Sequence, residues 1–180
     1  STQWSSSAAS DVYKRQLKTV RHNPKHILLS QGTQKEFYEG LGDDANGVII
    51  MSAYHPKAPF KGSLAGMQMN NADFAAEYHI TTGNKPDEDV AITFALCQGI
   101  DQAVRATGSV DDQTIMDWLH ARTPEDPVKT VLGNFAWDDR GLPLGKSFLM
   151  VQWQDGGNLE FVYPTNEFDT AEIVDPKPQW

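Results

Sequence analysis

Two runs of consecutive apolar residues stand out near the start of the regular hydrophobic pattern. Lys25–Ser30 reads KHILLS and Gly47–Tyr54 reads GVIIMSAY, and uninterrupted apolar runs of this length are typical of buried strands. Between them, Thr33–Leu41 starts with Thr33 and has Glu36 three residues later, which predicts a capping box and a short helix. A strand, a helix and a strand in close succession predict a βαβ unit and therefore a parallel sheet.

The middle of the chain changes to helical patterns. His55–Met69 contains two prolines and two glycines, so we expect an irregular connection there. A helix is predicted over Asp73–His79, capped by Asn70 or Asn71 and closed by Gly83.

The longest periodic segment runs from Glu88 to about Thr107 and ends at Gly108. Its apolar residues recur at spacings of three and four, which predicts that they face the core; they are Val90, Phe94, Cys97, Ile100, Ala103 and Val104. A further helix should start at Ser109–Asp112 and turn three apolar side chains inward, namely Ile115, Trp118 and Leu119.

A strand-like pattern returns in the last third of the chain. Strands are expected over Thr130–Leu132, Ser147–Gln154 and Leu159–Tyr163, with a hairpin turn at Asp155-Gly156-Gly157. The acidic, proline-bearing stretch after Pro164 is expected to form a surface strap. These patterns together predict an α/β domain, or interdigitated parts of two such domains.

The first residues do not fit this pattern. Ser1–Gln16 is polar and has no apolar period, and Ser6–Gln16 (SSAASDVYKRQ) resembles the translation of a sequencing adaptor. We therefore expect an adaptor-like leader outside the fold, with a genuine disordered leader as the alternative. The adaptor interpretation also leaves open a chimeric reading frame, and it means that the sequence carries no information about a signal peptide.

Composition narrows the possible partners. The chain has 180 residues, 39% of them hydrophobic, and a net charge of −9. This composition supports a packed core and argues against nucleic acid or an anionic membrane as partner. No apolar run approaches the roughly 18–20 residues of a membrane span. Cys97 is the only cysteine, so we expect no internal disulfide.

No sequence motif for catalysis or metal binding is present. The five histidines do not form an H-E-x-x-H pattern, and the chain lacks G-x-S-x-G, Walker A and G-x-G-x-x-G sequences. Neighbouring aspartates occur at turns and helix starts, where they are better explained as caps. We therefore expect a protein that binds a molecule without transforming it, not an enzyme, and we expect no cofactor and no metal.

Several motifs occur together in an order typical of one family. Lys129–Asp155 contains Thr130-Val131, Gly133, Trp137, Asp138–Gly141 and Gln152-Trp153, and Val90–Ser109 contains Ile92–Ala95 (ITFA) and Thr107–Ser109 (TGS). In this order and spacing, over residues 25–164, the chain resembles the C-terminal half of the type I periplasmic solute-binding proteins of ABC importers, the leucine/isoleucine/valine-binding family.

The resemblance implies part of a venus-flytrap fold, in which two α/β lobes close on a small molecule. The chain would hold a parallel-sheet C-terminal lobe plus helices of the N-terminal lobe, whose sheet would be missing. The expected segments are a leader (1–16), part of the C-terminal lobe (17–56), a crossover with helices of the N-terminal lobe (57–128), and the hinge return with the end of the C-terminal lobe (129–180).

The resemblance also implies a ligand site at strand ends. Ligands of open α/β sheets bind at the carboxyl ends of the strands, which here are followed by Gln31 and Tyr54. In the family an acidic residue placed like Gln31 contacts the ligand ammonium, so glutamine favours an amide-like or polar ligand. Tyr54 and Phe94 would offer aromatic walls. Core packing is the alternative for both aromatic residues.

These expectations lead to one principal functional hypothesis. The chain would be part of the substrate-binding component of an ABC transporter for an amino acid or a related small amide. Its partners would be the small-molecule ligand, an ABC permease and the missing N-terminal lobe. Its location would be periplasmic or anchored to the cell surface. A ligand-sensing domain of a receptor or regulator, or an enzyme whose catalytic half is missing, are the alternatives.

Overall fold

The computed structural model describes residues 12, 15–145, 148–165 and 168–179, so most of the predicted leader lies outside the described residues. The described residues divide into two compact units. Unit 1 comprises the described parts of Ser1–His55 and Phe148–Trp180, and unit 2 comprises the described part of Pro56–Ser147. Each unit is described below by itself.

Unit 1 is built on a four-stranded mixed sheet in the order β1-β2-β7-β8. The strands are β1 (Ile27–Leu29), β2 (Val48–Ser52), β7 (Leu149–Gln154) and β8 (Asn158–Tyr163). β1 and β2 pair in parallel, which confirms the predicted βαβ unit. β7 and β8 join as an antiparallel hairpin, so the sheet is mixed rather than wholly parallel.

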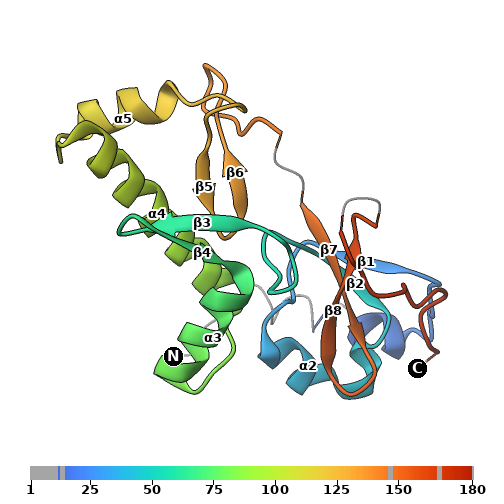
Figure 1. Ribbon diagram of the computed structural model, residues 1–180. Coiled ribbons are helices and arrows are strands. Elements are labelled where there is room, and N and C mark those ends of the chain that lie inside the picture. Colours follow the sequence, from blue (N-terminus) through green and yellow to red (C-terminus); the bar gives the residue numbers. More distant parts are fainter. Residues whose placement is uncertain (1–11, 13–14, 146–147, 166–167, 180) are drawn as a thin grey trace, which may run out of the picture. The chain divides into compact units, whose positions relative to one another are not determined.

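The segment between β1 and β2 covers the sheet with α2 (Lys35–Leu41) and the short 3-10 helix η1 (Gly42–Ala45) (Figure 1). Their side chains join one apolar core of the unit with residues of the sheet; the buried members are Ile27, Phe37, Ala45, Val48, Ile50, Val151 and Trp153. The apolar run of β2 is buried or half-buried throughout, whereas in β1 Leu28 is 62% exposed, so the first run is covered on one face only.

The predicted capping box of α2 is wrong. The helix begins at Lys35, and the N-cap residue is Gln34 rather than Thr33. Thr33 is buried, and the preceding carbonyl oxygen, that of Gly32, accepts a hydrogen bond from the Trp153 indole N–H at 2.9 Å. This tertiary contact fixes the turn after β1 against the core, so the helix starts only after Thr33.

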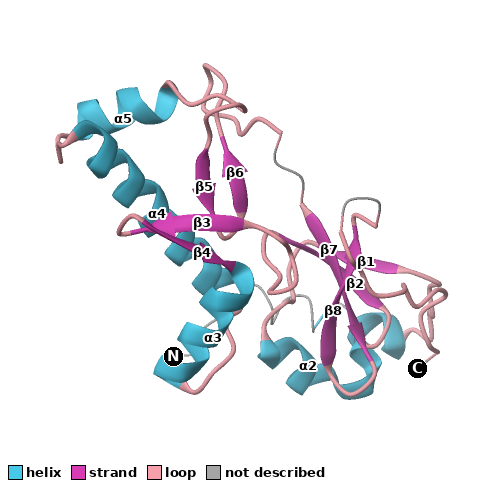
Figure 2. Ribbon diagram, in the orientation of Figure 1, coloured by secondary structure: helices cyan, strands magenta, loops and turns pink. Residues whose placement is uncertain are grey.

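Unit 2 contains three helices and two hairpins (Figure 2). The helices are α3 (Asn71–Thr82), α4 (Glu88–Thr107) and α5 (Asp112–His120). The strands β3 (Lys61–Leu64) and β4 (Met67–Asn70) form one hairpin, and β5 (Val128–Thr130) and β6 (Gly133–Phe135) form the other. The three predicted helices are confirmed.

Two expectations about unit 2 strands are wrong. The predicted irregular connection contains the β3–β4 hairpin, whose turn places Ala65 and Gly66 at φ 55° and 78°. An alanine at positive φ is uncommon, and here the Ala65 N–H donates to the Asp101 carboxylate of α4 at 2.8 Å. The predicted strand over Thr130–Leu132 is instead the end of β5 and a turn, in which Thr130 Oγ1 donates to Gly133 O at 3.0 Å.

The predicted core face of α4 is only partly right: Ala103 is buried, and Val90, Phe94 and Val104 are half-buried. The buried residues of this helix are Ala91, Ala95, Gln98 and Ala103, whereas Cys97 and Ile100 are exposed. Small side chains let β3 and β5 approach the helix closely, so the strands cover the alanine face instead of the face with larger apolar residues. In α5, all of whose residues are described, none is fully buried, and Ile115, Trp118 and Leu119 are half-buried.

The boundaries of the two observed units differ from those of the predicted segments. The chain passes from unit 1 to unit 2 after His55, next to the predicted boundary at residue 56. The predicted segment 129–180 is divided between the two units, because β5 pairs with β6 and Gln102 of α4 holds Lys129 by side-chain hydrogen bonds of 2.8 and 3.1 Å to its backbone. The assignment of the units to lobes stays a prediction.

Candidate ligand-binding site

One edge of the unit 1 sheet gathers four strand ends. The parallel strands β1 and β2 both end there, with Leu29 opposite Ile50. Ser52 pairs with Leu149 at the start of β7, and Met150 pairs with Tyr163 at the end of β8. The register therefore places the end of β8 and the start of β7 beside the carboxyl ends of the parallel pair, where α/β sheets bind ligands.

Gln31 lies at this edge and is exposed directly after β1. The next residue, Gly32, has φ 132°, a value that glycine reaches more easily than other residues. A Cβ on Gly32 would lie 3.0 Å from the Phe37 ring and 3.1 Å from Ile50. The backbone after Gln31 therefore packs directly on the core.

Tyr54 follows β2 at the same edge but is buried. The Ser52 hydroxyl donates to Tyr54 O at 2.8 Å and accepts from Tyr54 N–H at 3.1 Å, which closes a tight turn after the strand. The burial of the Tyr54 phenol raises its pKa, so the ring stays neutral at physiological pH. The contact of Tyr54 with a ligand stays a prediction, and its burial fits the core-packing alternative.

After Tyr54 the chain packs against strand β8 of the β7–β8 hairpin. The His55 Nε2 is 3.1 Å from the Leu159 carbonyl oxygen, and the His55 ring stacks on Phe161 at a centroid distance of 5.5 Å. Both contacts fall on β8. His55 is buried and therefore has a packing role here.

Phe94 belongs to unit 2 and lies on α4. Its ring stacks on Phe74 of α3, with centroids 4.5 Å apart and planes 24° apart. The two rings line an open groove of about 510 Å³ together with Tyr78, Asp89, Val90, Thr93 and Cys97. The structure thus brings Gln31 and Tyr54 to one sheet edge, while Phe94 lies in a mostly apolar groove of the other unit.

Two exposed aromatic residues at the candidate edge were missed from the sequence. Phe148 is 51% exposed just before β7, and Tyr163 is 52% exposed at the end of β8. The sequence analysis considered only the ends of the predicted parallel strands. An antiparallel neighbour that pairs with β2 brings its start to the edge where β2 ends, so Phe148 can be placed at this edge only once the pairing of β7 with β2 is known.

The aspartate-bearing turn at Asp138–Gly141 has a structural explanation. The Asp138 carboxylate accepts the backbone N–H of Leu142 at 2.8 Å and of Arg140 at 3.0 Å. Together with the Arg140 side chain, these donors hold the pKa of Asp138 below its usual range, with the Leu142 N–H as the largest cause. The half-buried carboxylate closes the turn through these hydrogen bonds.

The described residues contain no cluster of three or more His, Cys, Asp or Glu side chains that could hold a metal ion. Among the helices that the structure describes, none is long and apolar enough to cross a membrane. The exposed groups at the candidate edge are the Gln31 amide and the rings of Phe148 and Tyr163.

Comparisons with known proteins show which proteins this chain is similar to. No family model matches the chain. Its sequence is 29% identical over 138 residues to the Leu/Ile/Val-binding protein homolog 1 of Brucella suis, covering 76% of this chain and 36% of the relative. It is 23% identical over 138 residues to the Leu/Ile/Val-binding protein homolog 2 of Brucella abortus.

Solved structures give the fold. The leucine-binding protein LivK of Thermotoga maritima matches with a TM-score of 0.66 and 20% identity, over 86% of this chain and 41% of LivK. LivJ of Streptococcus pneumoniae, solved in complex with isoleucine, matches with a TM-score of 0.66 and 15% identity, over 94% of this chain and 42% of LivJ. The chain has part of the type I periplasmic binding protein fold. The resemblance inferred from the sequence is confirmed, and the chain spans about a third of the length of the Brucella relatives.

Proposed function

We propose that this protein supplies part of the substrate-binding component of an ABC importer for amino acids or related small amides. The observation that carries the proposal is the similarity to Leu/Ile/Val-binding protein homologues over 138 residues, together with the same fold in binding proteins for branched-chain amino acids. In this role the protein is located in the periplasm or anchored to the cell surface. It binds its ligand without chemical turnover, and its transport partner is an ABC permease.

The candidate ligand contacts in unit 1 are Gln31 and Tyr54. An exposed carboxamide offers one acceptor oxygen and two N–H donors, so Gln31 can accept a hydrogen bond from a ligand ammonium without supplying a negative charge. Tyr54, which is buried at the same edge, would offer its ring as an aromatic wall for the ligand. In unit 2, Phe94 is the candidate apolar wall, because its ring lines a largely apolar groove that remains accessible.

The proposal can be tested with a chimera. The 138 residues of the Brucella suis relative that match this chain are replaced by the corresponding residues of this chain, and thermal unfolding is followed with leucine, isoleucine, valine and short amides. A ligand at 100 times its Kd should stabilise the chimera by about 2.7 kcal/mol. A flat response across this panel, with the unmodified relative responding normally, would contradict the proposal, and so would consumption of the ligand.

A charge substitution at the candidate edge tests whether Gln31 contacts the ligand. In the chimera, Gln31→Glu should increase the affinity for leucine by about tenfold, since a carboxylate adds a charge-assisted hydrogen bond to the ammonium group. The matched control is Gln68→Glu, which introduces the same charge at an exposed position of β4. Equal effects of the two substitutions would show that Gln31 has no special relation to the ligand.

A further inference from the structure

A side chain from a distant strand holds the turn that carries Gln31. Trp153 lies on β7, and its indole N–H donates to the Gly32 carbonyl oxygen at 2.9 Å, across 121 positions of sequence. Trp153 is 5% exposed and Gly32 is buried, so this hydrogen bond lies inside the core. Gln31 comes directly before Gly32 and is exposed. The bond therefore connects the core of unit 1 to the backbone next to a candidate ligand contact.

The local sequence of this turn does not select its conformation. Between the end of β1 at Leu29 and the start of α2 at Lys35, the chain passes through Gly32 at φ 132°. Glycine adopts a wider range of backbone conformations than any other residue. The N-cap residue Gln34 does not cap α2 with its side chain. A contact from outside the segment is therefore needed to favour one path of the backbone over others.

Trp153 is itself held in place on several sides. Its carbonyl oxygen accepts the Gly47 N–H at 2.8 Å. Its ring lies against two aromatic rings of α2: that of Phe37, with centroids 6.4 Å apart and planes 15° apart, and that of Tyr38, with centroids 5.2 Å apart. The direction of the indole N–H is therefore set by packing. Loss of this donor would remove a hydrogen-bond partner of the Gly32 carbonyl group inside the core, which is unfavourable.

We propose that Trp153 is a positioning residue of the candidate ligand site. Its indole N–H fixes the backbone at Gly32, and this sets the direction in which Gln31 leaves the sheet edge. Trp153 is buried and acts through Gln31 rather than on the ligand. A hydrogen bond weakens steeply when its distance or angle departs from the optimum, so a displaced Gln31 would bind less well. The proposal rests on the proposed function, in which Gln31 is a ligand contact.

The first experiment measures the turn in the 180-residue chain without ligand. Trp153→Phe keeps an aromatic ring beside α2 but removes the indole N–H. Residual dipolar couplings from nuclear magnetic resonance report the direction of each backbone N–H. Those of Gln31 and Gly32 should change in this variant, whereas those of β2 should not. Tyr38→Leu is the matched control, because it removes a ring contact of Trp153 and leaves the hydrogen bond intact. Unchanged couplings at Gln31 and Gly32 in Trp153→Phe would overturn the proposal.

The second experiment measures affinity in the chimera, with the same panel of leucine, isoleucine, valine and short amides. Trp153→Phe should weaken binding by about tenfold when Gln31 is present. In the Gln31→Ala background the same change should cost less than about twofold, because a residue that acts through Gln31 has no effect once that side chain is removed. Tyr38→Leu should change the affinity by less than about twofold in either background. This difference between backgrounds is one that a purely structural role would not produce.

Each remaining outcome has one meaning. Full affinity in Trp153→Phe would overturn the proposal, as would a loss of equal size in the Gln31→Ala background. If Trp153→Phe does not fold, replacement of Trp153 by 3-benzothienylalanine takes its place in both experiments, since sulfur there replaces the indole N–H in a ring of nearly the same size. Changed couplings at Gln31, combined with no response of the unsubstituted chimera to any ligand of the panel, would support the positioning role and contradict only the proposed function.

Discussion

At the scale of single residues, Gly62 of β3 packs tightly against Gln98 of α4. Gln98 is fully buried, and its Oε1 is held by the Val131 N–H. Any side chain at position 62 would enter the space of the Gln98 amide. A glycine in a strand is often a site of close approach, but only the folded chain identifies the partner.

We therefore predict opposite effects for two glycine-to-alanine changes. Gly62→Ala should destabilise the protein by about 1–3 kcal/mol, because the new methyl group forces the buried amide to move. Gly99→Ala should stabilise it by up to about 1 kcal/mol through helix propensity, since the nearest atom to its Cβ is Val128 Cγ1 at 3.8 Å. Urea unfolding followed by circular dichroism measures both. Similar effects of the two changes would contradict this account of the packing.

The candidate site could be predicted from the sequence only in part. Gln31 was found because it follows a recognisable apolar strand, and it lies exposed at the sheet edge. Tyr54 was found by the same rule, but the structure buries it. Phe148 and Tyr163 were missed, because their position at this edge depends on the pairing of β7 with β2 and β8. Strand pairing over long sequence separations leaves no local pattern.

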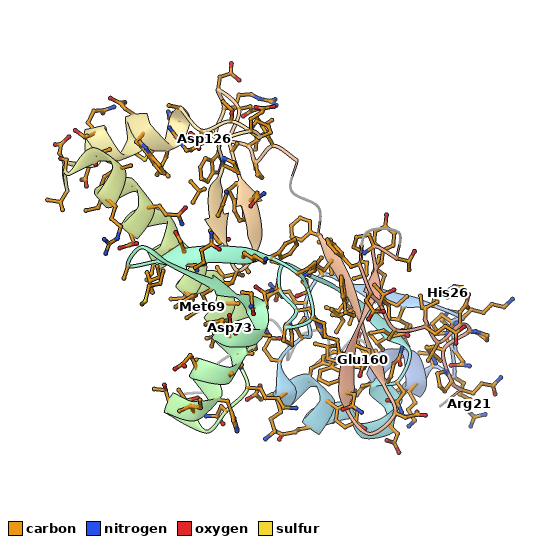
Figure 3. The ribbon with its side chains drawn as sticks, viewed as in Figure 1. Arg21, His26, Met69, Asp73, Asp126 and Glu160 are labelled. Carbon is orange, nitrogen blue, oxygen red and sulfur yellow. The ribbon has the colours of Figure 1, made fainter. Side chains whose placement is uncertain are left out.

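At the scale of elements, exposed helix starts were predicted well. The Asn70 side chain accepts the Asp73 N–H at 2.9 Å, and the Asp73 carboxylate accepts the Asn70 N–H at 3.4 Å; Figure 3 labels Asp73 in α3 and Met69 at the end of β4. The Asp87 side chain accepts the Val90 N–H at 2.9 Å at the start of α4. These caps are local bonds that need no distant partner.

The capping box of α3 gives a direct prediction. Asn70→Ala should destabilise unit 2 by about 1 kcal/mol, because the N-terminal N–H of Asp73 loses its acceptor. Asn70→Ser should retain most of the stability, since a serine hydroxyl can accept the same bond. Hydrogen exchange of the α3 amides, compared between the two variants, reports the change. Equal protection of α3 in both variants would show that the cap contributes nothing.

The hairpins of unit 2 were the elements that the sequence did not predict correctly. The β3–β4 turn uses Ala65 and Gly66 at positive φ in place of the Asn-Gly or Asp-Gly pairs typical of two-residue turns. Its support comes from Asp101, which lies far along the chain. The β3–β4 turn is therefore stabilised by helix α4, and the local sequence around the turn does not show this contact.

At the scale of the whole molecule, the C-terminal strap connects separate parts of unit 1. Within the described strap residues 168–179, Ala171 N–H donates to Phe161 O at 2.8 Å and Lys177 N–H donates to Lys25 O at 3.0 Å. Between these points, the buried Gln152 amide accepts from Val174 N–H at 2.8 Å and donates to Val174 O at 3.0 Å. The strap predicted after Pro164 is thus present, and it reaches from β8 to the start of β1.

Removal of residues 171–180 should destabilise unit 1 by about 1–3 kcal/mol, because the buried Gln152 amide loses both hydrogen bonds to Val174 and keeps those to Gly47 and Gln154. Urea unfolding of the truncated and full chains measures the difference. Val174→Ala is the matched control, since both bonds to Gln152 use the Val174 backbone, and it should be much milder than the truncation. A truncated chain of unchanged stability would show that the strap lies on the sheet without supporting it.

The sequence by itself determined the local elements of this protein: the βαβ unit, three helices with the cap of α3, and the β7–β8 hairpin. These depend on apolar period, caps and turn residues that lie within a few positions of one another. Only the tertiary structure decided which face of α4 is covered, how β7 and β8 join the sheet, and which side chains meet at its edge. Those outcomes depend on contacts between distant segments, where close packing of small residues outweighs the position of the larger apolar ones.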